Sequence, residues 1–254
     1  AEESATYIDS IGSQKKLVIE PMTNYSIGRI EVPIINKVSR FAVMTTNVSR
    51  KDNPGANVIG TDWDLGFYDN RLYTSGQIIR SNTNDITGNA YRLNFGYLDP
   101  VWWSVRFWYG TTNDKFDIND LGYLARSGTT WAGGKLELRR QEPWGKFISN
   151  KLELKIGKDW NDDLIIENAI DIEQYNLFSN YWGMGLFGKI FLPAYNDEDI
   201  FRNDNAWVYK TERWGYAGPR FATDRRKKIV FESSFGIGYG KNRGHGYRFG
   251  LELE

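Results

Sequence analysis

Two carboxylates, Asp171 and Glu173, stand one residue apart in a segment that alternates between apolar and polar side chains. Residues two apart in a strand point to the same face of a sheet. A pair of carboxylates on one face is what glycoside hydrolysis requires, one as general acid and the other as nucleophile or base. The same spacing also fits an acidic stripe that pairs with lysines and arginines of neighbouring strands, and this structural interpretation is favoured.

A second pair, Asp62 and Asp64, shares a face in the same way. With a further oxygen ligand from a neighbour, this pair could bind a hard cation. Opposite charges directly across neighbouring strands are, however, an ordinary stabiliser of a sheet. Ion pairs with Arg92 or Arg106 are therefore the favoured interpretation of these two aspartates.

The rare residue types narrow the chemistry further. The chain has no cysteine and a single histidine, His245, which lies in a glycine-rich turn. Disulfides, thiolate metal sites and serine–histidine or cysteine–histidine catalysis are therefore not expected. The oxygen-rich pieces 196–199 and 203–205 could bind calcium, but a solvated loop is their default interpretation. We predict no enzyme activity, no metal site and no cofactor.

Composition excludes some classes of protein and leaves others open. The 254 residues carry 32 lysines plus arginines and 32 aspartates plus glutamates, so the net charge is zero and a nucleic-acid partner is not expected. Aromatic residues make up 15% of the chain, and no apolar run of about 18 residues exists that could form a transmembrane helix. The mean hydropathy is negative. Membrane barrels share that property, because their polar inward face offsets the apolar outward face.

Alternation with a period of two runs through most of the chain and predicts about twelve strands. The hairpin 228–254 shows it most clearly, whereas 23–37 looks irregular. Turn chemistry predicts tight turns at 69–70, 99–100 and 179–180, and long connections at 81–88, 111–127 and 192–227. The predicted strands are 15–21, 40–48, 58–68, 72–79, 91–97, 101–109, 131–140, 151–157, 164–177, 181–191, 228–240 and 247–254. Four aromatics of the last long connection could stack on sugars or pack that loop, with packing favoured: Trp207, Tyr209, Trp214 and Tyr216.

The alternation sorts the side chains into two faces. The polar face carries far more charge than a packed protein core tolerates. Its predicted charged members are Asp62, Asp64, Arg92, Arg106, Lys135, Glu137, Arg139, Lys151, Glu153, Lys155, Asp171, Glu173, Glu232, Arg248 and Glu252. The other face is apolar, with aromatic residues at strand ends. Its predicted members include Trp63, Phe67, Phe95, Trp103, Phe107, Tyr109, Trp182, Phe231, Phe235, Tyr239, Tyr247 and Phe249.

Short turns alternate with long connections, as they do in outer-membrane barrels. We therefore predict an all-β fold, a transmembrane antiparallel up-and-down β-barrel with a polar, salt-bridged lumen and long extracellular loops. Residues 1–14 are interpreted as a leader or linker, and 15–254 as the barrel. The alternative is a soluble carbohydrate-active β-sandwich in which Asp171 and Glu173 bind or hydrolyse glycans. Its strand would be similar to the Glu-x-Asp-x-Glu strand of jelly-roll glycoside hydrolases, although Ala169 stands at the first position.

Loose motifs spread over residues 15–254 add a family resemblance. The most recognisable is Phe116–Arg126, which contains Asn119-Asp120-Leu121-Gly122. The other motifs are Thr23–Arg29, Ala42–Arg50, Asn57–Trp63, Gly218-Pro219-Arg220 and Asp224–Lys228. In these the chain resembles a group of outer-membrane proteins of unknown function, common in Bacteroidetes and related bacteria. They join an N-terminal domain similar to family 9 carbohydrate-binding modules to a C-terminal barrel.

The resemblance implies a location in the bacterial outer membrane but transfers no catalytic residue. The family's carbohydrate-binding domain is not among these residues, and its barrels continue further, so 15–254 is either a fragment of a longer barrel or a shortened relative. The expected function is a structural or binding barrel, or a narrow, porin-like passive channel. Its expected partner is outer-membrane lipid, with glycans or other outer-membrane proteins as further candidates.

Overall fold

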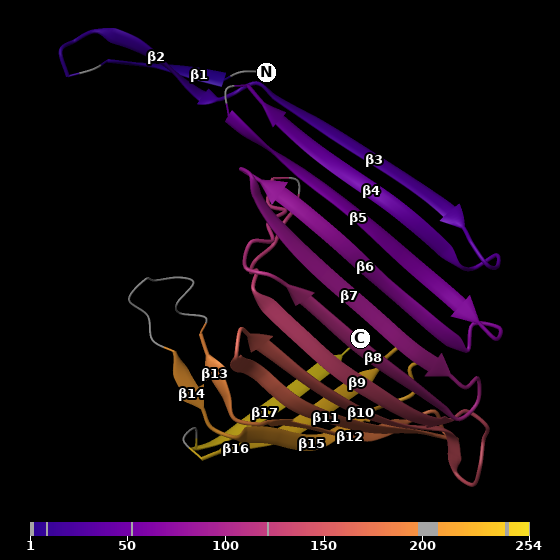
Figure 1. Ribbon diagram of the computed structural model, residues 1–254. Coiled ribbons are helices and arrows are strands. Elements are labelled where there is room, and N and C mark those ends of the chain that lie inside the picture. The colour runs from indigo at the N-terminus through magenta and orange to yellow at the C-terminus, as the bar shows by residue number, and fades with distance from the viewer. Residues whose placement is uncertain are drawn as a thin grey trace. The chain divides into compact units, whose positions relative to one another are not determined.

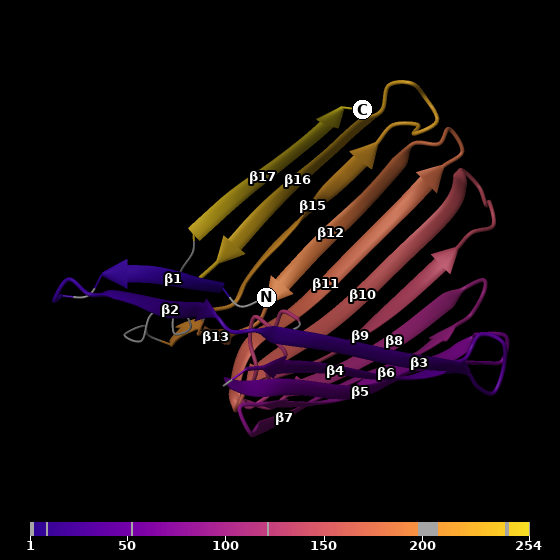
Figure 2. The same ribbon diagram turned by 90° about the horizontal axis from the view of Figure 1, so that it is seen from above.

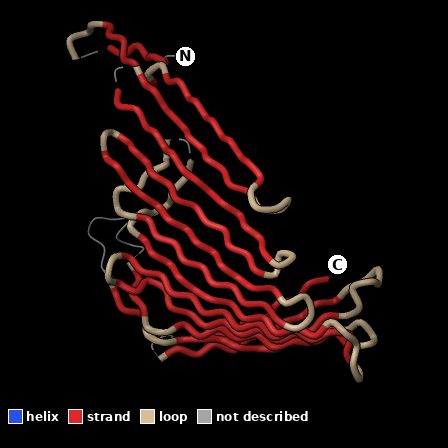
Figure 3. Tube along the Cα trace, turned by 45° about the vertical axis from the view of Figure 1, so that its right-hand side comes forward, coloured by secondary structure: helices blue, strands red, loops and turns tan. Residues whose placement is uncertain are grey.

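The computed structural model describes residues 3–8, 10–51, 53–120, 122–197, 208–241 and 244–253. These residues form strands, turns and loops and no helix (Figure 3). Within them, accordingly, no helix is long and apolar enough to cross a membrane. Several positions considered above lie outside the described residues: Leu121, 198–199, 203–205, Trp207 and Glu254.

Seventeen strands are present in the described part of the chain. They are β1 (Glu3–Ile8), β2 (Gln14–Glu20), β3 (Thr23–Pro33), β4 (Arg40–Arg50), β5 (Asn53–Phe67), β6 (Leu72–Thr83), β7 (Ile86–Leu98), β8 (Trp103–Thr112), β9 (Thr129–Arg140), β10 (Phe147–Asn161), β11 (Leu164–Phe178), β12 (Gly183–Phe191), β13 (Ala194–Asn196), β14 (Tyr209–Thr211), β15 (Trp214–Ala222), β16 (Phe231–Gly240) and β17 (Gly244–Leu253).

Thirteen of the strands form one sheet, in the order β17-β16-β15-β12-β11-β10-β9-β8-β7-β6-β5-β4-β3. Strands adjacent in sequence are adjacent in this sheet, except that β12 pairs with β15. The intervening β13 and β14 pair with each other in a two-stranded sheet, as do β1 and β2. The prediction of an all-β, antiparallel fold is confirmed.

Three predictions about individual segments were wrong. Residues 23–33 form strand β3, and Pro33 is its last residue, where an edge strand can accept proline. The connection predicted at 81–88 is a two-residue turn at Asn84 and Asp85, whose φ angles of 53° and 62° suit a tight hairpin. The connection predicted at 192–227 contains β15. The predicted strand 15–21 exists as β2, but it pairs with β1, which lies in the region interpreted as a leader.

The chain divides into two compact units. Unit 1 comprises Ala1–Leu65, Ser75–Leu93 and Thr111–Thr129, and in it β3, β4 and β5 lie side by side (Figure 1). Unit 2 comprises Gly66–Thr74, Asn94–Gly110 and Thr130–Glu254. Within unit 2, strands β10, β11, β12, β15, β16 and β17 follow one another side by side (Figure 2).

Apolar and polar side chains alternate along each strand of unit 2, and the pairing register aligns them from strand to strand. The sheet of unit 2 therefore has one apolar and one polar face. The apolar face is largely uncovered: six aliphatic side chains on it are between 38% and 57% exposed. These six are Leu136, Leu138, Leu154, Ile156, Ile172 and Leu186. In unit 1, Ile30 and Ile59 are similarly exposed, at 73% and 48%. Buried side chains in the described residues are few and mostly small, and several lie beneath the connection between β8 and β9.

Candidate functional site

The polar face of unit 2 carries a cluster of five linked charges on β9 and β10. Glu153 binds Lys135 at 2.8 Å and Lys151 at 2.9 Å. Glu137 binds Arg139 at 3.3 Å and Lys151 at 3.5 Å. Alternation places all five side chains on the same face, as the sequence predicts, and each carboxylate bridges two cations.

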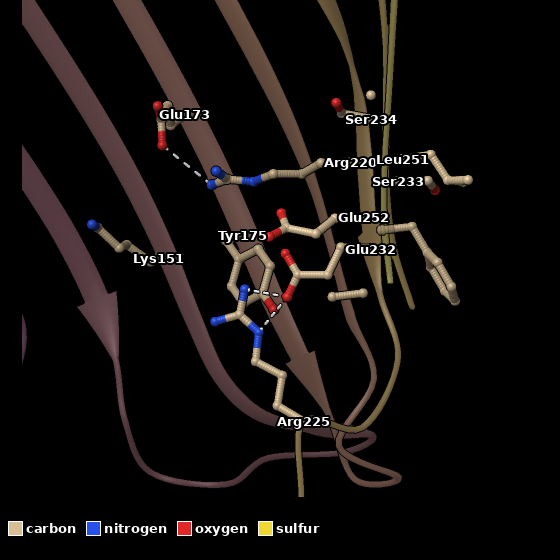
Figure 4. A pocket seen from close by; sticks show the side chains of 13 residues that line it. Lys151, Glu173, Tyr175, Arg220, Arg225, Glu232, Ser233, Ser234, Leu251 and Glu252 are labelled. Atoms are coloured by element: carbon tan, nitrogen blue, oxygen red, sulfur yellow. Dashed lines mark hydrogen bonds and ion pairs between the residues drawn. The ribbon is translucent and has the colours of Figure 1, made fainter. Parts of the chain in front are cut away.

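The two carboxylates that could serve glycoside hydrolysis are both ion-paired. Asp171 stands in register between Lys155 on β10 and Lys189 on β12, and its Oδ1 lies 3.6 Å from the Lys189 ammonium. The Arg220 guanidinium donates a 3.2 Å hydrogen bond to Glu173 (Figure 4). In this arrangement neighbouring strands supply a cation to each carboxylate, so neither is presented as a free acid or nucleophile.

A pocket of about 540 Å³ lies on the polar face near the turn between β15 and β16 (Figure 4). Arg220 extends over the Tyr175 ring, 5.2 Å from its centroid. Arg225 binds Glu232 at 2.6 Å, and Glu252 stands opposite Glu232 in the register of β16 and β17. The pocket alternates positive and negative groups, so it suits a neutral, polar solute better than a strongly charged one.

Aromatic side chains share the polar face with these charges. Phe191 and Trp214 stack with centroids 4.1 Å apart and planes 7° apart. Tyr216 and Phe187 continue the row, with centroids separated by 6.3 Å. The sequence assigned Trp214 and Tyr216 to a loop, whereas they lie on β15 and pack against β12. The sequence does contain a signal for this packing. Phe187 and Phe191 each stand two residues from Lys189, so alternation places all three side chains on the polar face.

In unit 1, β3 and β4 supply the partners of the second carboxylate pair. Arg29 binds Asp62 at 2.8 Å and Glu31 at 3.0 Å. Arg40 lies 3.5 Å from Asp64. The sequence suggested Arg92 and Arg106 as partners for these aspartates. In the structure the partners are Arg29 and Arg40 instead. Arg29 belongs to β3, which the sequence did not predict and which pairs with the edge of β4 opposite to β5. Within the described ranges, no three acidic or histidine side chains come together as a metal site would need.

The connection between β8 and β9, residues 113–128, packs on the polar face of unit 1, and we call it the inward segment. Phe116 is its anchor and only 4% exposed. Its backbone passes so close to Gly88 of β7 that a Cβ there would lie 2.2 Å from the Phe116 Cα. Small side chains at this end of β4 to β8 make room for the segment. The buried ones are Val48, Ala56, Ser81, Ala90 and Thr112.

Polar contacts fasten the inward segment to the sheet, beginning with two hydrogen bonds between Asn113 and Asn89 of β7, both 3.0 Å long. The Asp117 backbone N–H donates a 3.0 Å hydrogen bond to Ser81 Oγ. Arg50 at the end of β4 forms an ion pair with Asp120. Ser81 is fully buried, and Arg50 and Asp120 are only 23% and 21% exposed. The contacts therefore lie under the segment, within unit 1.

The inward segment is also folded by its own side chains. Asp117 Oδ1 accepts hydrogen bonds from the backbone N–H and the side-chain Nδ2 of Asn119, both at 2.9 Å. Asn119 Oδ1 accepts one from the Leu124 N–H at 2.8 Å. Asn and Asp stabilise tight turns by such local bonds. The most recognisable motif of the chain thus consists of the residues that shape and anchor this segment.

The turn between β15 and β16 is held by charge as well. The Arg226 guanidinium binds both carboxylate oxygens of Asp224, at 2.8 and 2.9 Å, and the Arg226 N–H adds a 3.0 Å bond. These hydrogen bonds, the side-chain ones above all, lower the pKa of Asp224 from 3.8 to about 2. At the turn between β7 and β8, the backbone N–H groups of Trp102 and Val101 bind Asp99 and lower its pKa.

The remaining site residues predicted from the sequence lie on strands. Arg92 lies on β7, Arg106 on β8, and Arg248 and Glu252 on the end strand β17. Members of the predicted apolar face are substantially exposed: 38–76% for seven of them. These are Trp103, Phe107, Tyr109, Phe235, Tyr239, Tyr247 and Phe249. Phe95 and Trp182 are each 44% exposed, whereas Trp63, Phe67 and Phe231 are half-buried.

The comparison with known families shows the family to which the chain belongs and gives no information about its chemistry. The profile of a family described as a domain of unknown function (DUF5916) matches residues 1–254. The chain belongs to the DUF5916 family. Curated proteins and solved structures give no match. Membership agrees with the resemblance to a family of unknown function, while the outer-membrane barrel of that resemblance stays a prediction.

Proposed function

We propose that this DUF5916 chain is an integral protein of the bacterial outer membrane whose large sheet crosses the bilayer as the wall of a β-barrel. The apolar face contacts lipid, and the polar face lines an aqueous lumen. The barrel is a structural or binding barrel or a narrow passive channel, and it is not an enzyme.

The observation that carries the proposal is the uncovered apolar face of a sheet whose other face is filled with ion pairs. Soluble proteins rarely expose apolar patches larger than a few hundred Å². Ion pairs on the opposite face exclude a packed core there, because buried charges are costly. A bilayer on one side and water on the other satisfies both faces. The strands that span unit 2, such as β10 and β11 with 15 residues each, are long enough to cross a bilayer when tilted.

Aromatic bands at the strand ends support the same arrangement. Ring pairs gather at the turn end of β7 to β15, with centroids 5.0 to 5.3 Å apart. The pairs are Tyr97–Trp103, Trp144–Phe147, Phe147–Phe178 and Trp182–Phe221. Tyr109, Trp160 and Tyr239 lie at the opposite strand ends. Aromatic girdles at both interfaces around an aliphatic band are characteristic of membrane barrels.

The inward segment and the ion pairs support a narrow lumen. Both occupy the face assigned to water, and the segment fills space over β4 to β8 in unit 1. The soluble β-sandwich with catalytic Asp171 and Glu173 is the weaker candidate. It would need a second layer over the apolar face, and both carboxylates are engaged by Lys189 and Arg220.

Cysteine labelling tests the proposal cleanly, because the chain has no native cysteine. Ile172→Cys probes the apolar face and Ser234→Cys the polar face of unit 2. In membranes, a water-soluble maleimide should label S234C and leave I172C unlabelled until the protein is denatured. Heat-modifiable migration in gels should accompany this pattern. Full labelling of I172C, with a monodisperse protein in the absence of detergent, would contradict membrane insertion.

A further inference from the structure

One arginine of unit 2 lies on the apolar face. Arg140 is the last residue of β9 and continues the row of Leu136 and Leu138. The preceding Arg139 points to the polar face and binds Glu137. Arg140 thus departs from the sorting of charges that most of this sheet region follows. Lys158 of β10, two positions beyond Ile156, is another cation on the apolar face, and it lies over the Trp160 ring. The surroundings of Arg140 explain what it can bind.

The Arg140 guanidinium lies between two tryptophans of the aromatic band. Its Cζ is 5.8 Å from the Trp102 centroid and 5.1 Å from that of Trp144. Trp144 is held in place by a hydrogen bond from its Nε1 to Asn150. Cation–π contacts of this kind position a guanidinium but leave its N–H groups available for an acceptor.

No carboxylate partners Arg140 in the part of the chain that the structure describes. Its Nε–H is buried and donates no hydrogen bond to the described part of the protein. After Arg140, the next charged residues in sequence are Glu142 and Lys146, both in the exposed turn after β9. Lys151 on β10 is bound to Glu153. A charge on a lipid-facing surface is costly unless an opposite charge meets it. The residues that the structure describes provide none, and this points to an acceptor from outside the protein.

A groove of about 410 Å³ begins beside this arginine. Trp103, Leu138 and Leu152 form its apolar walls, and Leu138 and Leu152 are 45% and 38% exposed. Asn150 and Gln174, the latter opposite Leu152 in the register, also line it. The groove is continuous with the aliphatic band of the same face, so it accommodates a chain whose polar end stays at the tryptophans.

We propose that this site binds a membrane phospholipid, with the phosphate of the headgroup on Arg140 and an acyl chain along the groove. The guanidinium fork matches a phosphate in charge and geometry. Tryptophan belts mark the headgroup level of a bilayer, where a basic residue meets lipid phosphate. The inference rests on the proposed membrane function and adds a specific lipid site to it.

Native mass spectrometry of the detergent-purified chain, titrated with phosphatidylglycerol, tests the site. Arg140→Gln should weaken lipid retention at least tenfold, and Leu152→Trp, which fills the groove and keeps the arginine, should also reduce it. Arg248→Gln, on the polar face of β17, is the matched control and should bind as the wild type does. Heat-modifiable migration of each variant verifies that it is folded.

Inorganic phosphate at the same concentration separates a lipid site from an anion site. It should neither displace the lipid nor raise the melting temperature of the wild type. Displacement by inorganic phosphate, or unchanged retention by folded R140Q, would overturn the inference. This test can fail independently of the cysteine labelling. If I172C is shielded from the maleimide but folded R140Q retains lipid as the wild type does, the lipid site is rejected and the membrane proposal stands.

Discussion

Arg50 on β4 and Asp120 in the inward segment form an ion pair across 70 positions of sequence, within unit 1. Both side chains are largely covered, at 23% and 21% exposed. The pair sits at one end of the segment's contacts and Phe116 at the other. Together they hold 113–128 against the polar face, which in the proposed function is the wall of the lumen.

Loss of this ion pair should loosen the inward segment without unfolding the sheet. For Asp120→Asn we expect a loss of about 1–2 kcal/mol from the segment's attachment, since a hydrogen bond to a charged group contributes on that scale. Limited proteolysis should then cut within 113–128 faster than in the wild type. Asp114→Asn is the matched control, because Asp114 is exposed and contacts Ser127 through its backbone carbonyl. Equal cleavage of D120N and D114N would show that the pair does not hold the segment.

Gly88 should be required for the segment to reach the sheet. In Gly88→Val the new Cβ would lie 2.2 Å from the Phe116 Cα, which is backbone and cannot turn aside. We expect a loss of about 1–3 kcal/mol, typical of overpacking. Gly157→Val is the control, because nothing lies within 4 Å of a Cβ at Gly157 of β10. Denaturant titration of both variants measures the difference, and equal stability would contradict the close approach of Phe116.

Much of the sheet could be predicted from the sequence because charge and alternation agree there. In β9 and β10, charged residues at every second position identify the polar face, and the cluster of five charges around Glu153 follows from that pattern. β3 was missed because apolar residues occupy both of its faces: Ile27 is 65% and Ile30 is 73% exposed on opposite sides of this edge strand. Because the segment 23–37 shows no clear alternation, its sequence does not predict a strand.

The candidate sites were predicted less completely, because they depend on contacts between distant residues. Asp62 and Asp64 share one face, as the alternation predicts. Asp62, however, pairs with Arg29 of the missed strand β3, and Asp64 pairs with Arg40 of β4. The polar composition of residues 81–88 predicts a loop, but the turn consists of Asn84 and Asp85 alone. Ser81, Asn82 and Thr83 belong to β6, and Ser81 is buried under the inward segment. No local pattern shows that residues 113–128 fold onto a sheet, since Arg50 and Gly88 acquire their roles only in the tertiary structure.

Glu153 should control the charge of the lumen. It neutralises both Lys135 and Lys151, at 2.8 and 2.9 Å. Glu153→Gln leaves Glu137 as the one carboxylate of the cluster for Lys135, Lys151 and Arg139, so the wall gains one net positive charge and a channel carrying the variant should become more permeable to anions. Reversal potentials in planar bilayers under a salt gradient measure this shift. Glu142→Gln changes the net charge equally but lies in the exposed turn after β9, and it should leave the reversal potential unchanged. Equal shifts of the reversal potential in both variants would contradict the position of Glu153 on the wall of a conducting lumen.

The turn between β15 and β16 should lose its order in acid. Bonds from Arg226 lower the pKa of Asp224 from 3.8 to about 2, so the folded turn favours the ionised carboxylate. A group whose pKa is lower in the folded protein stabilises the fold fully at pH values above its pKa in the unfolded chain. That stabilisation is lost as the pH falls through the pKa in the folded protein. Stability of the turn should therefore be constant above about pH 5 and decline from about pH 4 towards pH 2.

Hydrogen exchange of the backbone amides in 223–230, followed as a function of pH and corrected for intrinsic rates, measures the decline. The Lys227 N–H is a suitable reporter, since it donates to the Asp224 carbonyl at 3.1 Å within the turn. In Asp224→Asn the protection should be low at every pH, because the neutral amide cannot pair with the guanidinium. Asp69→Asn, in the turn after β5, is the control and should keep the wild-type profile at 223–230. A profile that stays flat to pH 2 in the wild type would mean that the ion pair with Arg226 does not order this turn.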